Sequence, residues 1–184
     1  MAKDKVILGV DPGTNIMGYG IIKITGKEIT VLSFGVVMLN KIEGHTLKLK
    51  SIFEKTTSLI ERYLPDEMAV EAPFFGKNVQ SMLKLGRAQG VIMAAALNKN
   101  IGIEEYAPRK IKQSVTGNGN ASKEQVAGMV ESILKTKIES KFMDATDGLA
   151  VALCHHYQDN ALLKGGGSKN WASFIKNNPG RIQG

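Results

Sequence analysis

Four acidic residues of this 184-residue chain have the types and spacing of a hydrolytic metal site. Asp11 and Glu71 each end a short apolar run, and Asp144 and Asp147 are three positions apart, which places both on one face of a helix. Four carboxylates held together repel one another unless divalent cations neutralise them, and hard oxygen ligands select Mg²⁺ or Mn²⁺. Two such ions cleave phosphodiesters, one activating water and the other stabilising the leaving oxygen.

Each of these acids also has a structural explanation. Asp11 opens an Asp-Pro-Gly-Thr turn, in which its side chain would accept hydrogen bonds from backbone amides, and Glu71 would be a solvated strand end. Asp144 would cap a helix, with Asp147 complementing the helix dipole. Both aspartates nevertheless lie outside the apolar face of that helix. This face is formed by Ala145, Leu149, Ala152 and Leu153.

The order of predicted elements describes a mixed sheet with helices on both faces. Apolar and β-rich runs predict strands over 6–11, 17–25, 28–39, 68–71 and 102–106, the second and third joined as a hairpin at Gly26-Lys27. Helical patterns follow at 44–64, 78–98, from 107, from 122 and at 144–157. Ser122 and Gln125 fit a capping box. In such a sheet, strand ends converge on the crevice where ligands bind, which would bring Asp11 and Glu71 together.

The predicted helix 78–98 carries glycines at 86 and 90 in its apolar stripe. Each costs about 1 kcal/mol relative to alanine in a helix interior, so a close backbone approach is expected there. Packing of the helix on the sheet is one explanation. A seam between two copies of the chain is the other.

Charge favours a polyanionic partner. Lys and Arg number 24 against 17 Asp and Glu, giving a net charge of +7 and an isoelectric point near 9.4. Eight basic and two acidic residues lie between 77 and 123, and the chain from 164 onward holds four basic residues and no acid. Such segregation suits a nucleic-acid-binding face. A cation at Lys123, in the first turn of a helix, opposes the helix dipole and predicts an anion nearby.

Composition predicts one globular domain in the cytoplasm, because 43% of residues are hydrophobic, 22% are charged, and the chain starts without a secretory signal. The lone cysteine, Cys154, is expected to be a core residue. His155 lies about 16 Å along the helix from Asp144, too far to share its metal, and His156 is expected to be the core histidine. No histidine-rich metal site is expected.

Five segments, in order and at characteristic spacing, resemble a RuvC-type Holliday-junction resolvase over residues 6–157. They are 7–14 (Ile-Leu-Gly-Val-Asp-Pro-Gly-Thr), 18–20 (Gly-Tyr-Gly), 70–71 with Phe74, Lys77 and Asn78, 83–90 (Leu-Lys-Leu-Gly-Arg-Ala-Gln-Gly) and 144–150 (Asp-Ala-Thr-Asp-Gly-Leu-Ala). The resemblance implies an RNase H-like α/β fold with a five-stranded mixed sheet. It also implies a nuclease domain over 1–160, followed by a flexible basic tail over 161–184.

The resemblance further implies a homodimer that nicks four-way DNA junctions symmetrically with Mg²⁺ or Mn²⁺, two ions per site, and works with the RuvA–RuvB branch-migration complex. Asp11, Glu71, Asp144 and Asp147 match the catalytic and metal-binding positions of the family. The matching DNA-binding positions are Phe74, Lys77, Lys112 and Lys123.

Three other functions compete with this one. The strand-Asp-Pro-Gly-Thr start is shared with actin-like and sugar-kinase-like nucleotide binders, although those proteins duplicate the fold and 184 residues accommodate one copy. A non-catalytic junction-binding protein would need only the basic faces. An RNase H-type hydrolase of RNA–DNA hybrids would share the metal chemistry but not the aromatic Phe74.

Overall fold

The computed structural model describes residues 4–73, 78–138 and 143–164, the side chains of 160–164 excepted. The strands are β1 (Lys5–Asp11), β2 (Ile16–Thr25), β3 (Glu28–Met38), β4 (Glu67–Glu71) and β5 (Gly102–Tyr106). The helices are α1 (His45–Tyr63), α2 (Val79–Leu97), α3 (Pro108–Thr116), α4 (Lys123–Leu134) and α5 (Met143–Lys164). The predicted element order is therefore confirmed.

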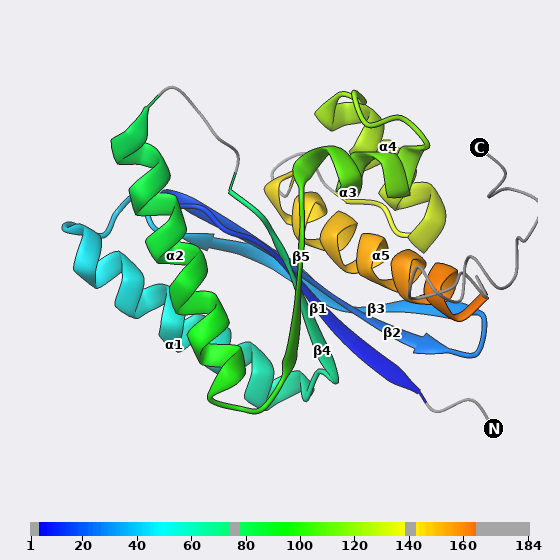
Figure 1. Cartoon of the computed structure of the whole chain (residues 1–184), viewed down its shortest axis with the longest axis horizontal. Coiled ribbons are helices and arrows are strands. Elements are labelled where there is room, and N and C mark those ends of the chain that lie inside the picture. The colour runs from blue at the N-terminus through cyan, green and yellow to red at the C-terminus, as the bar shows by residue number, and fades with distance from the viewer. Residues whose placement is uncertain (1–3, 74–77, 139–142, 165–184) are drawn as a thin grey trace, which may run out of the picture.

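The five strands form one mixed sheet in the order β3-β2-β1-β4-β5. β1 pairs antiparallel with β2 and β2 with β3, whereas β1–β4 and β4–β5 are parallel pairs. α1 and α2 cover one face, and α3, α4 and α5 lie on the other (Figure 1). The predicted α/β fold, a five-stranded mixed sheet with helices on both faces, is confirmed.

Alternation along β1 builds a core on each side of the sheet. Ile7 packs into the core under α3, α4 and α5, while Leu8 and Val10 pack into the core under α1 and α2. All three side chains are fully buried. The central strand is therefore anchored from both faces, which holds its carboxyl end firmly.

Glycines let α5 approach the sheet at backbone contact distance. A Cβ added to Gly9 of β1 would lie 2.2 Å from the carbonyl oxygen of Gly148, and one added to Gly18 of β2 would lie 2.1 Å from that of Asp144. A Cβ on Gly148 would in turn lie 2.5 Å from the Tyr19 backbone. Only glycine fits at these positions. The sequence analysis missed this role, although glycines inside predicted strands are its usual signal.

One helix end differs from the sequence predictions. α5 continues to Lys164, seven residues past the predicted end at Tyr157. Strong helix formers at 161–164 extend it up to the glycine run that follows. The proposed tail lies, from residue 165 onward, outside the described residues. Within the described residues no helix is both long and apolar enough to span a membrane.

Candidate active site

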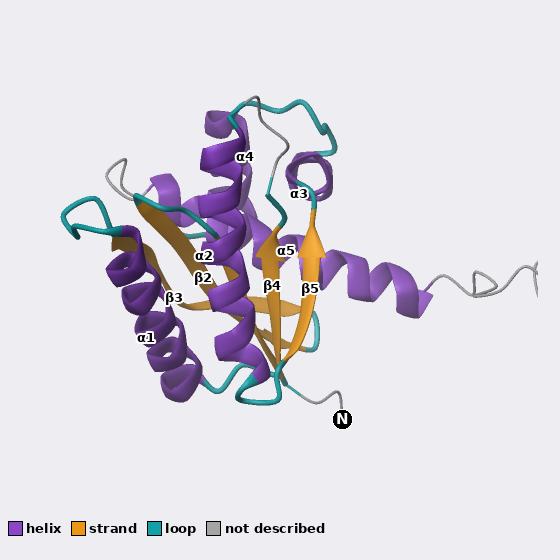
Figure 2. Ribbon diagram, turned by 60° about the vertical axis from the view of Figure 1, so that its left-hand side comes forward, coloured by secondary structure: helices purple, strands orange, loops and turns teal. Residues whose placement is uncertain are grey.

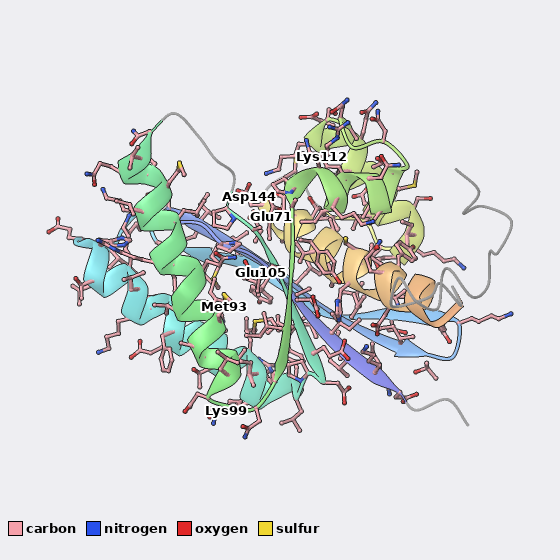
Figure 3. All side chains as sticks on the ribbon, in the orientation of Figure 1. Glu71, Met93, Lys99, Glu105, Lys112 and Asp144 are labelled. Carbon is pink, nitrogen blue, oxygen red and sulfur yellow. The ribbon has the colours of Figure 1, made fainter. Side chains whose placement is uncertain are left out.

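Parallel pairing of β1 with β4 brings Asp11 and Glu71 to the same edge of the sheet. Val10 is the register partner of Val70, and each acid follows directly. The first turn of α5 adds Asp144 and Asp147, because the glycine contacts seat that turn on β2. Figure 3 shows Glu71, Asp144 and Lys112 gathered at this end, and Figure 2 shows α3 beyond the end to which β5 points.

A cavity of about 190 Å³ opens between these elements. Three of the four acids line it, and Asp144 is joined to the group through Lys123, which contacts both Asp144 and Asp147. α3 and α4 supply its other wall. The lining residues are Asp11, Glu71, Pro108, Ile111, Lys112, Lys123, Val126, Asp147 and Ala150.

Crowding and burial raise the pKa values of three carboxyl groups. Burial, followed by the charges of Glu71 and Asp147, raises the pKa of Asp11 well above its ordinary value. Burial and then Asp147 raise the pKa of Glu71 to about 7, against the opposing effects of Lys112 and Lys123. Burial also raises the pKa of Asp147, although Lys123 lowers it. The positive groups among the described residues therefore do not fully compensate the negative charges of these three carboxylates.

Lys123 is the closest cation to these acids. Its Nζ donates to Asp144 Oδ1 at 2.6 Å and lies 2.8 Å from Asp147 Oδ2. Burial lowers the pKa of Lys123, but the hydrogen bonds to the two aspartates outweigh burial and hold that pKa above its ordinary value. The anion predicted near Lys123 is thus present in the chain itself.

The turn, strand-end and capping explanations of the acids are not supported, although Asp144 does lie in the first turn of α5, where a carboxylate complements the helix dipole. Within the described residues no hydrogen bond from a turn amide stabilises the Asp11 carboxylate; burial and neighbouring acids dominate its environment. Glu71 lines a cavity and is not a solvated strand end. Asp144 lies in the first turn of α5 and not at its cap, since the helix begins at Met143.

This donor set fits a hard divalent cation. Four carboxylates face two ammonium groups, those of Lys112 and Lys123, and no histidine or cysteine lines the cavity among the described residues. Hard oxygen ligands with excess negative charge suit Mg²⁺ or Mn²⁺ and not zinc or copper. Of the proposed DNA-binding residues, Lys112 lines the cavity from α3, whereas Phe74 and Lys77 lie outside the described residues.

A second polar group, which we call the Lys5 cluster, consists of Lys5, Glu67, Tyr106, His155 and Asp159. His155 is 3% exposed, and its two ring nitrogens lie 2.8 Å from the Tyr106 hydroxyl and 2.5 Å from Glu67 Oε2. Lys5 Nζ lies 2.6 Å from Glu67 and also contacts Asp159. The expectation that His156 is the core histidine was therefore wrong. The α5 surface facing the sheet includes position 155 and leaves His156 half-buried.

The Lys5 cluster also contains a possible set of metal ligands. Ligand atoms of Glu67, His155 and Asp159 all lie within 4.8 Å of one another. The Lys5 ammonium contacts both carboxylates of this set, so a positive charge of the chain itself already compensates them.

Comparisons with known proteins place this geometry in a family. A family profile described as "Crossover junction endodeoxyribonuclease RuvC" matches residues 7–155. The chain is 59% identical over 180 residues to a Cytophaga hutchinsonii protein of that description, covering 98% of this chain and 89% of that protein. It is 55% identical to one from Porphyromonas gingivalis, covering 98% of both.

Solved structures agree with the sequence comparisons. The Thermus thermophilus RuvC structure matches at 31% identity with a TM-score of 0.76, covering 84% of this chain and 95% of that one. The structure of T. thermophilus RuvC in complex with a Holliday junction substrate matches with a TM-score of 0.78, covering 84% and 94% at the same identity. The chain therefore belongs to the RuvC family of crossover junction endodeoxyribonucleases.

Proposed function

We propose that this chain resolves four-way DNA junctions by metal-dependent, symmetrical nicking of phosphodiester bonds. The observation that carries the proposal is the cavity in which Asp11, Glu71 and Asp147 converge with Asp144 beside them. Family membership supplies the substrate class. The nucleotide-binding alternative loses its basis, because the likeness of this chain to RuvC extends over residues 7–155 and not only over the strand-turn start.

Asp11, Glu71, Asp144 and Asp147 would hold two Mg²⁺ ions, for which Mn²⁺ would substitute. When bound, the ions supply a nucleophilic water and stabilise the leaving oxygen. Burial is the main cause of the raised pKa of Asp11, and the charges of both Glu71 and Asp147 also raise it, so Asp11 is suited to contact both ions. No covalent intermediate with the protein is required.

The basic residues of the cavity would guide the phosphodiester toward the acids. Lys112 lines the wall that α3 contributes and lowers the pKa of Glu71, so its charge acts inside the site. Lys123 stands at the start of α4 on the same wall. Phe74 and Lys77 remain proposed DNA contacts, Phe74 by stacking on unpaired bases, which is worth about 1–3 kcal/mol per base.

The test is cleavage of an immobile four-way junction and of a matched linear duplex, in Mg²⁺ or EDTA, by wild type and Asp11→Asn. We expect paired nicks only in the junction and only with metal, and we expect Asp11→Asn to bind the junction without cutting it. Tight junction binding with no cut in any metal or sequence would favour the architectural alternative. Cleavage of an RNA–DNA hybrid in preference to the junction would favour the RNase H-type alternative.

We also propose a homodimer formed through α2. Val79, Leu83 and Leu97 are 64%, 51% and 62% exposed along one stripe of this helix. A Cβ added to Gly86 or Gly90 in the same stripe would meet nothing within 4 Å, so packing on the sheet does not explain these glycines. A second α2 could approach closely there, and two sites on opposite strands would produce paired nicks.

Gly86→Leu should weaken this dimer, as measured by sedimentation. Gly128→Leu is the matched control, because Gly128 is an equally open helical glycine on α4. An unchanged dimer in Gly86→Leu would refute the α2 seam.

The family resemblance also leads us to propose that the chain acts in the cytoplasm with the RuvA–RuvB branch-migration complex. Co-sedimentation of this chain with RuvA and RuvB on a four-way junction tests the partnership. The partnership would be contradicted if the three proteins together bound the junction no better than each protein does alone.

A further inference from the structure

We infer that Lys123 competes with divalent cations for Asp144 and Asp147, and that metal binding releases its ammonium group to the DNA. This inference rests on the proposed function, since it concerns the same acidic site. It assigns Lys123 a role in setting metal affinity and in coupling metal binding to DNA contact.

The contact geometry supports direct competition. Lys123 Nζ lies 2.6 Å from one carboxylate and 2.8 Å from the other, the close range of charge-assisted hydrogen bonds. The Lys123 ammonium therefore engages an oxygen of each aspartate that would hold the ion, so a divalent ion held by these aspartates would have to displace it. Strong repulsion between the two cations would oppose simultaneous binding at this distance.

The Lys123 side chain is able to move while its backbone stays in place. Ser122 and Gln125 form a reciprocal capping box at the start of α4. The backbone N–H of Gln125 donates to Ser122 Oγ at 3.2 Å, and the backbone N–H of Ser122 donates to Gln125 Oε1 at 2.9 Å. The Lys123 side chain itself is 41% exposed. A flexible lysine stem on a fixed helix start can swing from the aspartates toward solvent.

The displaced ammonium needs another anion. A cation in the first turn of α4 opposes the helix dipole, and the two aspartates offset that unfavourable position. Once a metal ion occupies the aspartates, a DNA phosphate entering the cavity is the anion within reach of the helix start. Metal and DNA binding would then reinforce one another through Lys123.

Lys112 provides a matched control. It lines the same cavity and carries the same charge, and its ammonium group makes no ion pair with the four acids within the described residues. Substituting either lysine with methionine removes one positive charge from the site. Only Lys123→Met would also remove a direct competitor for the aspartate oxygens.

The first experiment measures Mn²⁺ binding by electron paramagnetic resonance, without DNA, to wild type, Lys123→Met and Lys112→Met. We expect Lys123→Met to bind Mn²⁺ about tenfold more tightly than wild type and Lys112→Met about threefold or less. Equal effects of the two substitutions, or weaker binding by Lys123→Met, would overturn the competition. Circular dichroism and melting curves check that both variants fold.

The second experiment measures junction binding with and without Ca²⁺ in place of the catalytic metal. Wild-type affinity should rise with the metal about threefold to tenfold more than that of Lys123→Met, and the wild-type salt dependence should gain about one phosphate contact. Equal gains would overturn the release of Lys123 to DNA.

The two proposals fail in different ways. Wild type that binds no Mn²⁺, or binds it equally well after Asp11→Asn, would contradict the metal-dependent function itself. Mn²⁺ binding that depends on Asp11 but is insensitive to Lys123 would contradict only the present inference.

Discussion

The two polar clusters at opposite ends of the sheet differ in how fully their carboxylates are paired with ammonium groups. β1 and β4 begin at the Lys5 cluster, with Lys5 and Glu67, and end at the acidic cavity, with Asp11 and Glu71. In the Lys5 cluster the ammonium group contacts both carboxylates, and His155 adds a second hydrogen-bonding partner to Glu67. At the acidic cavity, the three carboxylates that line it and Asp144 beside them share two ammonium groups.

The difference distinguishes a charge-compensated cluster from the proposed metal site. Burial lowers the pKa of Lys5, but hydrogen bonds to Asp159 and Glu67 outweigh burial and raise it, so those charges stabilise one another. In the cavity, burial and like charge raise the pKa values of Asp11 and Glu71, so that ionising these groups is costly. The metal ions proposed for this site would neutralise these acids.

The largest expected effect is on cleavage. Asp147→Asn should lower single-turnover cleavage of a four-way junction by about 1,000-fold or more, because it removes the charge of a proposed metal ligand. Glu67→Gln, a matched change in the Lys5 cluster, should keep cleavage within about threefold at 25 °C, because it leaves the proposed catalytic acids unchanged. Similar losses in both variants would erase the distinction between the clusters.

The next largest effects are expected from substitutions of the glycines that let α5 pack closely on the sheet. Gly18→Ala places a Cβ 2.1 Å from the Asp144 carbonyl oxygen, so α5 must shift and carry both aspartates with it. We expect a loss of about 3 kcal/mol in the free energy of unfolding, measured in urea, and about 100-fold slower cleavage.

Gly128→Ala is the control, since a Cβ there meets nothing within 4 Å. It should raise stability by about 0.5–1 kcal/mol, because it replaces a glycine in a helix interior. Equal behaviour of the two alanine variants would show that close approach at Gly18 is unimportant.

The Lys5 cluster should contribute to stability and not to chemistry. His155→Ala should lower the free energy of unfolding by about 2 kcal/mol, because it removes a buried side chain that contacts the Tyr106 hydroxyl and Glu67 and leaves Glu67, among the described residues, only its Lys5 contact. The same change at half-buried His156 should cost about 1 kcal/mol or less. Urea denaturation of both variants measures the difference, and a larger cost at His156 would contradict this assignment.

The smallest effect is a pH dependence of stability. The folded-state pKa of Glu71 is about 7, above its ordinary 4.5, so the folded protein holds this proton more tightly than the unfolded chain. Stability in EDTA should therefore fall as pH rises from about 4.5 to 7. Glu71→Gln should remove about 1–2 kcal/mol of that fall. Urea denaturation at several pH values measures this difference. If the free energy of unfolding changes with pH equally in wild type and Glu71→Gln, the pKa of Glu71 is not raised in the folded protein.

Local signals in the sequence were sufficient to predict the helices and strands and the meeting of Asp11 and Glu71 at one edge of the sheet. Apolar runs predicted the strands, and the Ser122–Gln125 pair predicted the capping box at the start of α4. Parallel strand ends explained why Asp11 and Glu71 meet. These features depend on neighbours in sequence or on one strand pairing, which a periodic pattern reveals.

Long-range packing determined the remaining features. The choice of His155 over His156 as the buried histidine depended on how α5 rotates against the sheet, and the open stripe at Gly86 depended on which face of α2 meets α1. The anions beside Lys123 are Asp144 and Asp147, which are 21 and 24 positions away in the sequence. The sequence by itself determined which groups carry charge and which elements bear them. Only the tertiary structure decided which charges compensate one another, because that depends on distances of a few ångströms between elements brought together by packing.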